Sequence, residues 1–221
     1  MTRTARPGRA KAETRKLIAL LGPDAGEEKR LIDGLRSMVV EPGILRIRLN
    51  APAATGGDVP PAGGIGGLVE AWGEKGALER LAHDLRTLST TLGAYLVDVS
   101  EEKGHDVVPE SGSARKVVGI LLRKWDQSAR DTRARWDEHV PLALRIHHGA
   151  TSYTRNWVSQ PLADSADVFG LAMLRFASTE SLDHGYYVAP ELESRAELAH
   201  DIARFVGIAI RLTVRERLIE R

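Results

Sequence analysis

The sequence contains no cysteine. This absence excludes disulfide bonds, thiolate-bound zinc or iron–sulfur centres and a cysteine nucleophile, and it fits the cytoplasmic location that we expect for the chain. Long hydrophobic runs are also missing, because the longest uncharged apolar stretch, Val168 to Leu174, is far shorter than the roughly 20 residues of a membrane helix. We therefore expect no membrane partner. The chain also lacks a basic start followed by an apolar core, so we expect no secretion signal.

The chain has few aromatic residues and a net charge close to zero. Aromatic side chains make up 5% of the 221 residues and the net charge is +1, yet 43% of the residues are apolar, which predicts a globular protein of one large or two small domains. Residues 1–16 contain six basic side chains and one acidic side chain, or +5, so the remainder carries 1 − 5 = −4. A basic arm over residues 1–14 suits nucleic acid or an acidic partner. Because the rest of the chain is acidic, we expect a solvated tail and no nucleic-acid partner.

Two similar segments lie 100 residues apart. Arg15 to Leu21 reads RKLIALL, and Arg115 to Leu122 reads RKVVGILL. Both are short apolar runs bounded by charge, which predicts two buried strands. A repeat distance of this length indicates a duplicated domain rather than a solenoid. The chain then divides into a basic arm (1–14), a first copy (15–104), a linker (105–114) and a second copy (115–221).

The same order of elements follows both strands. In the first copy the apolar spacing predicts helices near 26–38 and 78–88 and strands near 44–49, 68–72 and 94–99. In the second copy it predicts helices near 128–139 and 190–206 and strands near 153–158, 168–176 and 208–214. Each copy is thus β-α-β-β-α-β, the ferredoxin-like order. Helices then cover one face of each sheet, so we expect an α+β fold in which the uncovered faces of the two sheets pack against each other.

The stretch from 130 to 158 carries residues suited to acid–base chemistry. Trp136 and His139 are three apart and so share one face of the predicted helix. Pro141 disfavours helical geometry at Val140, which predicts that His139 lies at the helix's C-terminal end, where the helix dipole favours a charged imidazole. Such a histidine can act as a general acid or base near neutral pH. The alternative is a structural histidine that packs on Trp136 and bonds a loop carbonyl.

The pattern Trp136-x-x-His139-x-Pro141, followed by Tyr153-x-x-Asn156, resembles the signature of the EthD family, a member of the dimeric α+β barrel superfamily. The resemblance covers residues 115–215, whereas the first copy lacks the Trp-x-x-His-x-Pro pattern. It implies a barrel of two ferredoxin-like sheets, formed here within one tandem chain, with a degenerate site in the first copy. A homodimer of such barrels is one option for assembly. Similar proteins include cofactor-free dehydratases, cyclases and monooxygenases and a lactone isomerase, and more distant ones bind haem.

Two more histidines and a tyrosine extend the candidate catalytic set. His147 and His148 are neighbours, so on an extended chain they point to opposite sides and cannot easily ligate one metal ion. No i,i+4 histidine pair or glutamate ligand accompanies them, and we expect no metal but a second acid or base. Tyr153 either hydrogen-bonds a phenol or carbonyl in a cavity or packs in the core. Tyr153 and Asn156 lie three apart on a strand, so they face opposite sides unless a bulge intervenes.

Further residues are candidates for substrate binding. Arg145 could pair with a substrate carboxylate, or with Asp137 or Glu138. The polar aromatic segment from His184 to Tyr187 predicts a lid or a substrate-ordering loop, or else a packed surface loop. The predicted catalytic residues are His139, His147, His148 and Tyr153. The predicted substrate-binding residues are Trp136, Arg145, Asn156, His184, Tyr186 and Tyr187.

Several common active-site motifs are absent from the sequence. The glycine-rich run 63–67 does not have the spacing of a nucleotide-binding loop, and there is no Gly-x-Ser-x-Gly nucleophile motif. We therefore expect no cofactor. The sequence predicts a small cofactor-independent lyase, such as a dehydratase or decarboxylase, that acts in catabolism on an aromatic or oxygenated small molecule held in the barrel. The alternatives are a non-catalytic binding module for a hydrophobic ligand, a cofactor-free monooxygenase, a haem-binding protein and a purely structural barrel.

Overall fold

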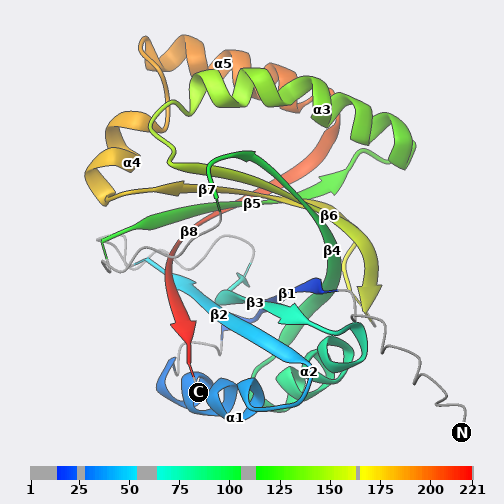
Figure 1. The fold of residues 1–221 in the computed structure, drawn as a ribbon. Coiled ribbons are helices and arrows are strands. Elements are labelled where there is room, and N and C mark those ends of the chain that lie inside the picture. Colours follow the sequence, from blue (N-terminus) through cyan, green and yellow to red (C-terminus); the bar gives the residue numbers. More distant parts are fainter. Residues whose placement is uncertain (1–13, 24–27, 54–63, 106–112, 163–164, 221) are drawn as a thin grey trace, which may run out of the picture.

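Eight strands close into one antiparallel barrel, with helices on two opposite sides (Figure 1). The computed structural model describes residues 14–23, 28–53, 64–105, 113–162 and 165–220, so nearly all of the predicted arm and most of the predicted linker fall outside the described residues. The strands are β1 (Arg15–Leu21), β2 (Ile44–Pro52), β3 (Gly67–Gly73), β4 (Thr91–Lys103), β5 (Arg115–Arg123), β6 (Ser152–Leu162), β7 (Val168–Phe176) and β8 (Val206–Ile219). The helices are α1 (Glu28–Val39), α2 (Lys75–Leu88), α3 (Ala129–Ile146), α4 (Thr179–Gly185) and α5 (Glu191–Ile202).

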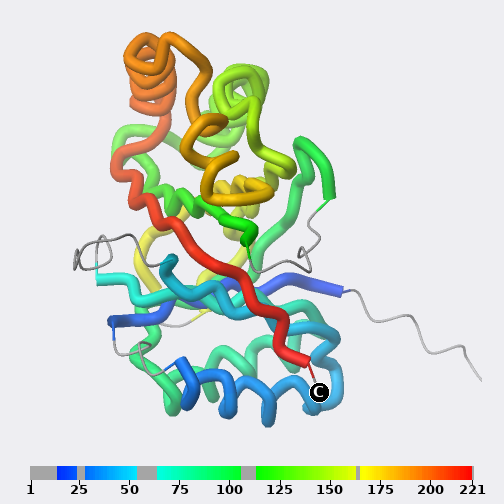
Figure 2. The backbone as a smooth tube through the Cα atoms, turned by 90° about the vertical axis from the view of Figure 1, so that its left-hand side faces the viewer, coloured from blue at the N-terminus to red at the C-terminus, as the bar shows by residue number. Residues whose placement is uncertain are grey.

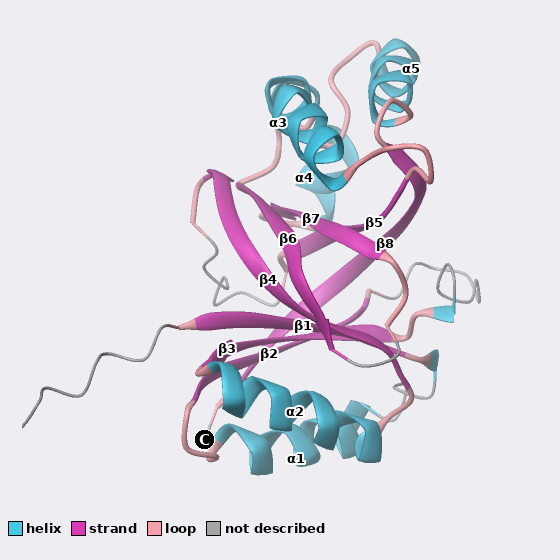
Figure 3. Ribbon diagram, turned by 90° about the vertical axis from the view of Figure 1, so that its right-hand side faces the viewer, coloured by secondary structure: helices cyan, strands magenta, loops and turns pink. Residues whose placement is uncertain are grey.

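Each half of the chain contributes one sheet to the barrel. The strand order is β4-β1-β3-β2 in the first half and β8-β5-β7-β6 in the second, and the sheets join where β2 pairs with β8 and β4 pairs with β6. The two longest strands, β4 and β8, each take part in one of these joins, and Figure 2 shows β8 running from the second sheet to the first. Helices α1 and α2 cover the outer face of one sheet, and α3, α4 and α5 cover that of the other (Figure 3). The predicted α+β fold, two ferredoxin-like copies paired into a barrel, is confirmed.

The apolar periodicity of the sequence explains the core of the first half. Alternate residues of each strand face outward onto α1 and α2, whose apolar stripes pack against them. Leu35, Leu78 and Leu85 are fully buried in this layer. No helix among the described residues is long and apolar enough to span a bilayer.

Helix α3 differs from its prediction, because it continues through Pro141 to Ile146. Proline removes one backbone hydrogen bond, to the carbonyl of Asp137, but both residues are on the exposed side of the helix, where water can solvate the freed carbonyl. The prediction that His139 lies at the C-terminal end was therefore wrong. It lies in the middle of the helix, and the helix dipole does not act on it.

The inside of the barrel contains a symmetric pair of lysines. Lys16 of β1 donates a hydrogen bond to the side-chain oxygen of Asn156 in the second half at 2.8 Å. Lys116, its equivalent in β5, donates to the side-chain oxygen of Asn50 in the first half at 3.2 Å. Between them lies Glu70 of β3, which is fully buried and bonded to both lysines. These contacts tie each half to the other across the barrel.

Further charges complete this interior cluster. Arg48 lies 3.1 Å from a carboxylate oxygen of Glu216, and Arg175 lies 2.5 Å from the other oxygen of the same carboxylate. The cluster thus holds four basic side chains against two carboxylates, all of them at most 4% exposed. Apolar side chains fill the rest of the interior; they include Ile18, Leu68, Val118, Leu171 and Val214.

Candidate functional site

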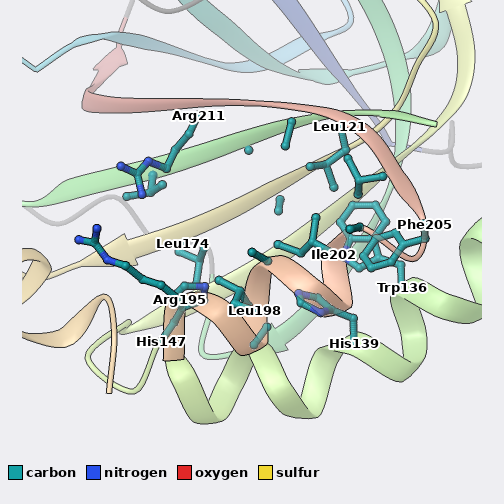
Figure 4. Close-up of a pocket in the computed structure, with 18 of the residues that line it drawn as sticks. Leu121, Trp136, His139, His147, Leu174, Arg195, Leu198, Ile202, Phe205 and Arg211 are labelled. Atoms are coloured by element: carbon teal, nitrogen blue, oxygen red, sulfur yellow. The ribbon is translucent and has the colours of Figure 1, made fainter. Parts of the chain in front are cut away.

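A cavity of about 410 Å³ lies between the outer face of the second sheet and the helices α3 and α5 (Figure 4). We expected the pocket inside the barrel, and this prediction was wrong because apolar side chains and the ion cluster fill that interior. The cavity exists because its walls carry small side chains. On the sheet side the cavity is lined by Gly119, Ala172 and Ala209. On the helix side it is lined by Ala143, Ala199 and Ala203. In the first half the leucines of α1 and α2 fill the equivalent layer.

His139 lies in this cavity and is 95% buried. Its Nδ1 atom is 2.7 Å from a carboxylate oxygen of Asp201, in α5. Burial lowers the pKa of His139, and the hydrogen bond and charge of Asp201 offset this only in part. The imidazole is therefore neutral at neutral pH, with its Nδ1 proton donated to Asp201. Its Nε2 lone pair has no hydrogen-bond partner among the described residues and is free to accept a proton.

Trp136 and Tyr153 form a hydrogen-bonded pair beside this histidine. The indole Nε1 of Trp136 donates to the hydroxyl oxygen of Tyr153 at 3.2 Å. Gly170 of β7 makes room for the indole, since a Cβ at this position would lie 2.3 Å from the Trp136 ring. Burial raises the pKa of Tyr153 to about 12, so its hydroxyl keeps its proton. Because the oxygen already accepts from Trp136, the phenolic proton is available to a ligand.

His147 occupies another part of the cavity wall. It caps the C-terminus of α3, and its Nδ1 atom hydrogen-bonds the backbone carbonyl of Tyr186. The contact is close because Gly149 donates its backbone N–H to Gly185 at 3.0 Å, which holds the ends of α3 and α4 together. Burial lowers the pKa of His147 to about 4, so the ring is neutral. Its ring lies 4.4 Å from that of Tyr186.

Comparison with known proteins gives a fold but no family. No protein-family model and no curated protein matches the sequence. An anthrone oxidase-like protein superposes with a TM-score of 0.66 at 10% identity, over 96% of this chain and 95% of that chain. A protein from Fusobacterium nucleatum described as a monooxygenase gives 0.60 at 8% identity, over 96% of both chains. A protein described as a chlorite dismutase gives 0.52 at 12% identity, over 95% of this chain and 96% of that chain.

The chain has the dimeric α+β barrel fold. The neighbours share its architecture along nearly their whole length, which agrees with the fold implied by the resemblance. The narrower EthD assignment is not confirmed by any comparison. Sequence identities of this level show a shared fold and no shared activity, so only the residues of the cavity indicate its chemistry.

The structure brings only some of the predicted site residues together in the cavity. The predicted residues that line the cavity are Trp136, His139, His147, Tyr153, Tyr186 and Tyr187. His148 and His184 are exposed and do not line it. Arg145 points to the surface and pairs with Glu197 at 2.5 Å, not with a residue of its own helix. Asn156 faces the barrel interior, opposite to Tyr153, as the strand alternation predicts.

Sequence reasoning missed the residues that α5 and β8 contribute. Asp201 pairs with His139 from 62 residues away, and Arg195, Phe205 and Arg211 also line the cavity. No local spacing connects these residues to α3, because only the packing of α5 over the sheet brings them near. Among the described residues there is no group of three or more side chains that could hold a metal ion.

Proposed function

We propose that this protein is a small-molecule enzyme that removes a proton from a carbon next to a carbonyl group, and that its overall reaction is a cofactor-independent lyase reaction. One observation carries the proposal: a neutral His139, oriented by Asp201, presents an unpartnered Nε2 to a largely apolar cavity. A base needs this combination of reach, a free lone pair and a low-dielectric surrounding. Tyr153, with its free phenolic proton, supplies the matching acid.

The two groups divide the work of an elimination. His139 takes the proton from the carbon, and the electron pair of the broken C–H bond moves toward the carbonyl oxygen. Tyr153 stabilises this oxygen by donating a hydrogen bond. The electron pair then forms the new C=C bond as a hydroxyl leaves the neighbouring carbon, and the protonated His139 returns its proton to make water. No proton is gained or lost overall, so the cycle needs no cofactor.

Oxygenation is the second candidate function, and the neighbours favour it. Two of the superposed proteins are described as anthrone oxidase-like and as a monooxygenase. The acidic CH₂ of an anthrone lies opposite the carbonyl of its central ring and is conjugated with it through the fused rings, so its first step is an analogous deprotonation that gives an extended enolate. The enolate would then react with molecular oxygen instead of expelling a hydroxyl group.

An isotope experiment tests the shared first step and separates the outcomes. The protein is incubated in D₂O with a panel of β-hydroxyketones, phenolic ketones and anthrones, first without and then with oxygen. We expect deuterium to enter the recovered substrate at the acidic carbon, and mass spectrometry then shows loss of water for a lyase or uptake of oxygen for an oxygenase. If compounds bind but none gains deuterium, proton transfer is refuted and a binding module remains.

Gly119 offers a steric test of where the chemistry occurs. A Cβ at this position would meet only ordinary contacts, 3.7 Å from Ala172 and Leu121, so a larger side chain can extend into the cavity. We expect Gly119→Leu to abolish deuterium exchange while the melting temperature stays equal or rises, because glycine weakens a central strand. Gly119→Ala is the control and should keep most of the exchange. Full exchange in Gly119→Leu would place the reaction elsewhere.

A further inference from the structure

One end of the cavity carries two arginine side chains. Arg195 of α5 and Arg211 of β8 lie at the end away from Trp136 and Phe205 (Figure 4). His139 lies nearer the aromatic end in the same view. The two arginines also line a second cavity of about 420 Å³, so they stand where the apolar cavity meets a more polar one. A ligand in the apolar cavity can therefore contact both guanidinium groups at this end.

Arg211 has no carboxylate partner among the described residues. Its guanidinium interacts instead with the hydroxyl groups of Tyr186 and Tyr187, and lies 5.2 Å from the ring centroid of Tyr186. These contacts hold the side chain in place but supply no carboxylate. An oriented arginine of this kind at the edge of an apolar cavity is suited to a carboxylate, which its planar fork can bind with two hydrogen bonds.

Arg195 is a second and weaker cation at the same end. It pairs with Glu191 one helical turn earlier, and both side chains are more than half exposed. Such a pair contributes little and can open at small cost when a better anion is near. The Arg195 guanidinium also lies 4.9 Å from the ring centroid of Tyr187, which keeps it beside the cavity.

We propose that Arg211, assisted by Arg195, binds the carboxylate of the ligand, and that the ligands of this cavity are therefore aromatic carboxylates. The ring of such a ligand would lie among the apolar and aromatic side chains between the two ends. Its carboxylate fixes the direction in which it lies, so the opposite end of the molecule reaches His139 and Tyr153. This inference shares its cavity with the proposed function and otherwise does not depend on it, because it concerns the binding of the ligand and not its conversion.

The test compares a charged probe with its neutral counterpart. Affinities of 2-naphthoate and 2-naphthamide, which have nearly the same shape, are measured by calorimetry on wild type, Arg211→Gln and Arg195→Gln. We expect wild type to prefer the acid by about tenfold or more, since hydrogen bonds to charged groups are the stronger ones. Arg211→Gln should weaken naphthoate binding by about 10- to 100-fold and leave naphthamide unchanged, and Arg195→Gln should have a smaller effect of the same kind.

Arg145→Gln is the matched control, because this surface arginine of α3 does not line the cavity. It should bind naphthoate as wild type does. Equal wild-type affinities for acid and amide, equal losses for both in Arg211→Gln, or no naphthoate binding at millimolar concentration would each overturn the inference. If wild type binds naphthoate in an Arg211-dependent way but exchanges deuterium into no compound of the panel, the proposed reaction alone is refuted and the inference about the carboxylate stands.

Discussion

Replacing His139 by alanine is expected to lower kcat by about 10²–10⁴-fold, the usual contribution of a general base. The melting temperature should stay within a few degrees of wild type, because Asp201 keeps its hydrogen bond from Arg204 at 2.9 Å. Steady-state kinetics on the substrate found in the D₂O panel, with a thermal melt of each variant, measure both. His148→Ala is the control, since His148 is an exposed histidine of the same segment outside the cavity. A folded His139→Ala variant with wild-type kcat would contradict the proposed mechanism.

Asp201→Asn extends this prediction to pH. The reaction needs neutral His139, so kcat should fall as the pH drops through the pKa of this histidine, which burial places below its ordinary value of 6.5. The hydrogen bond and charge of Asp201 raise this pKa. Removing the charge should therefore lower the pKa further and move the acidic limb of the pH–rate profile to lower pH. The plateau of kcat should fall because the imidazole loses its fixed orientation. A limb that stays in place or moves to higher pH would show that another group controls it.

The second large effect is expected on stability, from Glu70→Gln. Glu70 is fully buried, and Lys116, Lys16 and Arg48 hold the pKa of its carboxyl well below its usual range despite burial, which acts to raise it. Neutralising Glu70 removes one of the two carboxylates of the interior cluster and leaves its four basic side chains, with Glu216 as the remaining carboxylate of that cluster. Breaking a buried ion pair from one side costs about 3–5 kcal/mol. For a chain of this size the melting temperature should fall by about 10 °C.

The double variant Lys16→Met/Glu70→Gln provides the control. It removes one cation together with the anion, so the charge excess of the barrel interior stays as in wild type. We expect urea denaturation to show a smaller loss of unfolding free energy for the double variant than for Glu70→Gln alone. Because the folded-state pKa of Glu70 is depressed, its contribution is present above about pH 4.5 and is lost as the pH falls below that value. Equal losses in the single and double variants would show that Lys16 does not interact with Glu70.

The repeat in the sequence was sufficient to predict two ferredoxin-like sheets that face each other, and the family resemblance added that they form a barrel. Strands such as Arg15–Leu21 and Arg115–Arg123 are apolar runs with sharp charged borders, and the leucine stripes of α1 and α2 have clear helical spacing. The end of helix α3 was predicted too early, and this has a physical cause. The preference of a residue before proline is local, whereas the burial of Ala143 and Ile146 beyond Pro141 stabilises the helix through tertiary contacts.

The site could be predicted only where its residues lie close together in the chain. Trp136, His139 and Tyr153 come from one helix and the strand that follows, and a motif can contain them. Asp201 and Arg211 reach the cavity through the packing of the last helix and strand, and their sequence neighbours give no sign of it. The location of the cavity depends on how the volumes of the side chains fill the space on each side of the sheet. Only the folded structure shows that apolar and charged side chains fill the barrel interior, while alanines and glycines leave space outside it.

The reciprocal bonds Lys16–Asn156 and Lys116–Asn50 are the contacts of an isologous interface, retained within one chain. An interface of this kind does not distinguish its own second half from that of another molecule. Two chains could exchange halves without losing any of these bonds, as in domain swapping. What favours closure within one chain is the short connection from Lys103 to Arg115, which keeps the second half at a high effective concentration beside the first. We therefore expect the length of this connection to influence whether a barrel is made of one molecule or two.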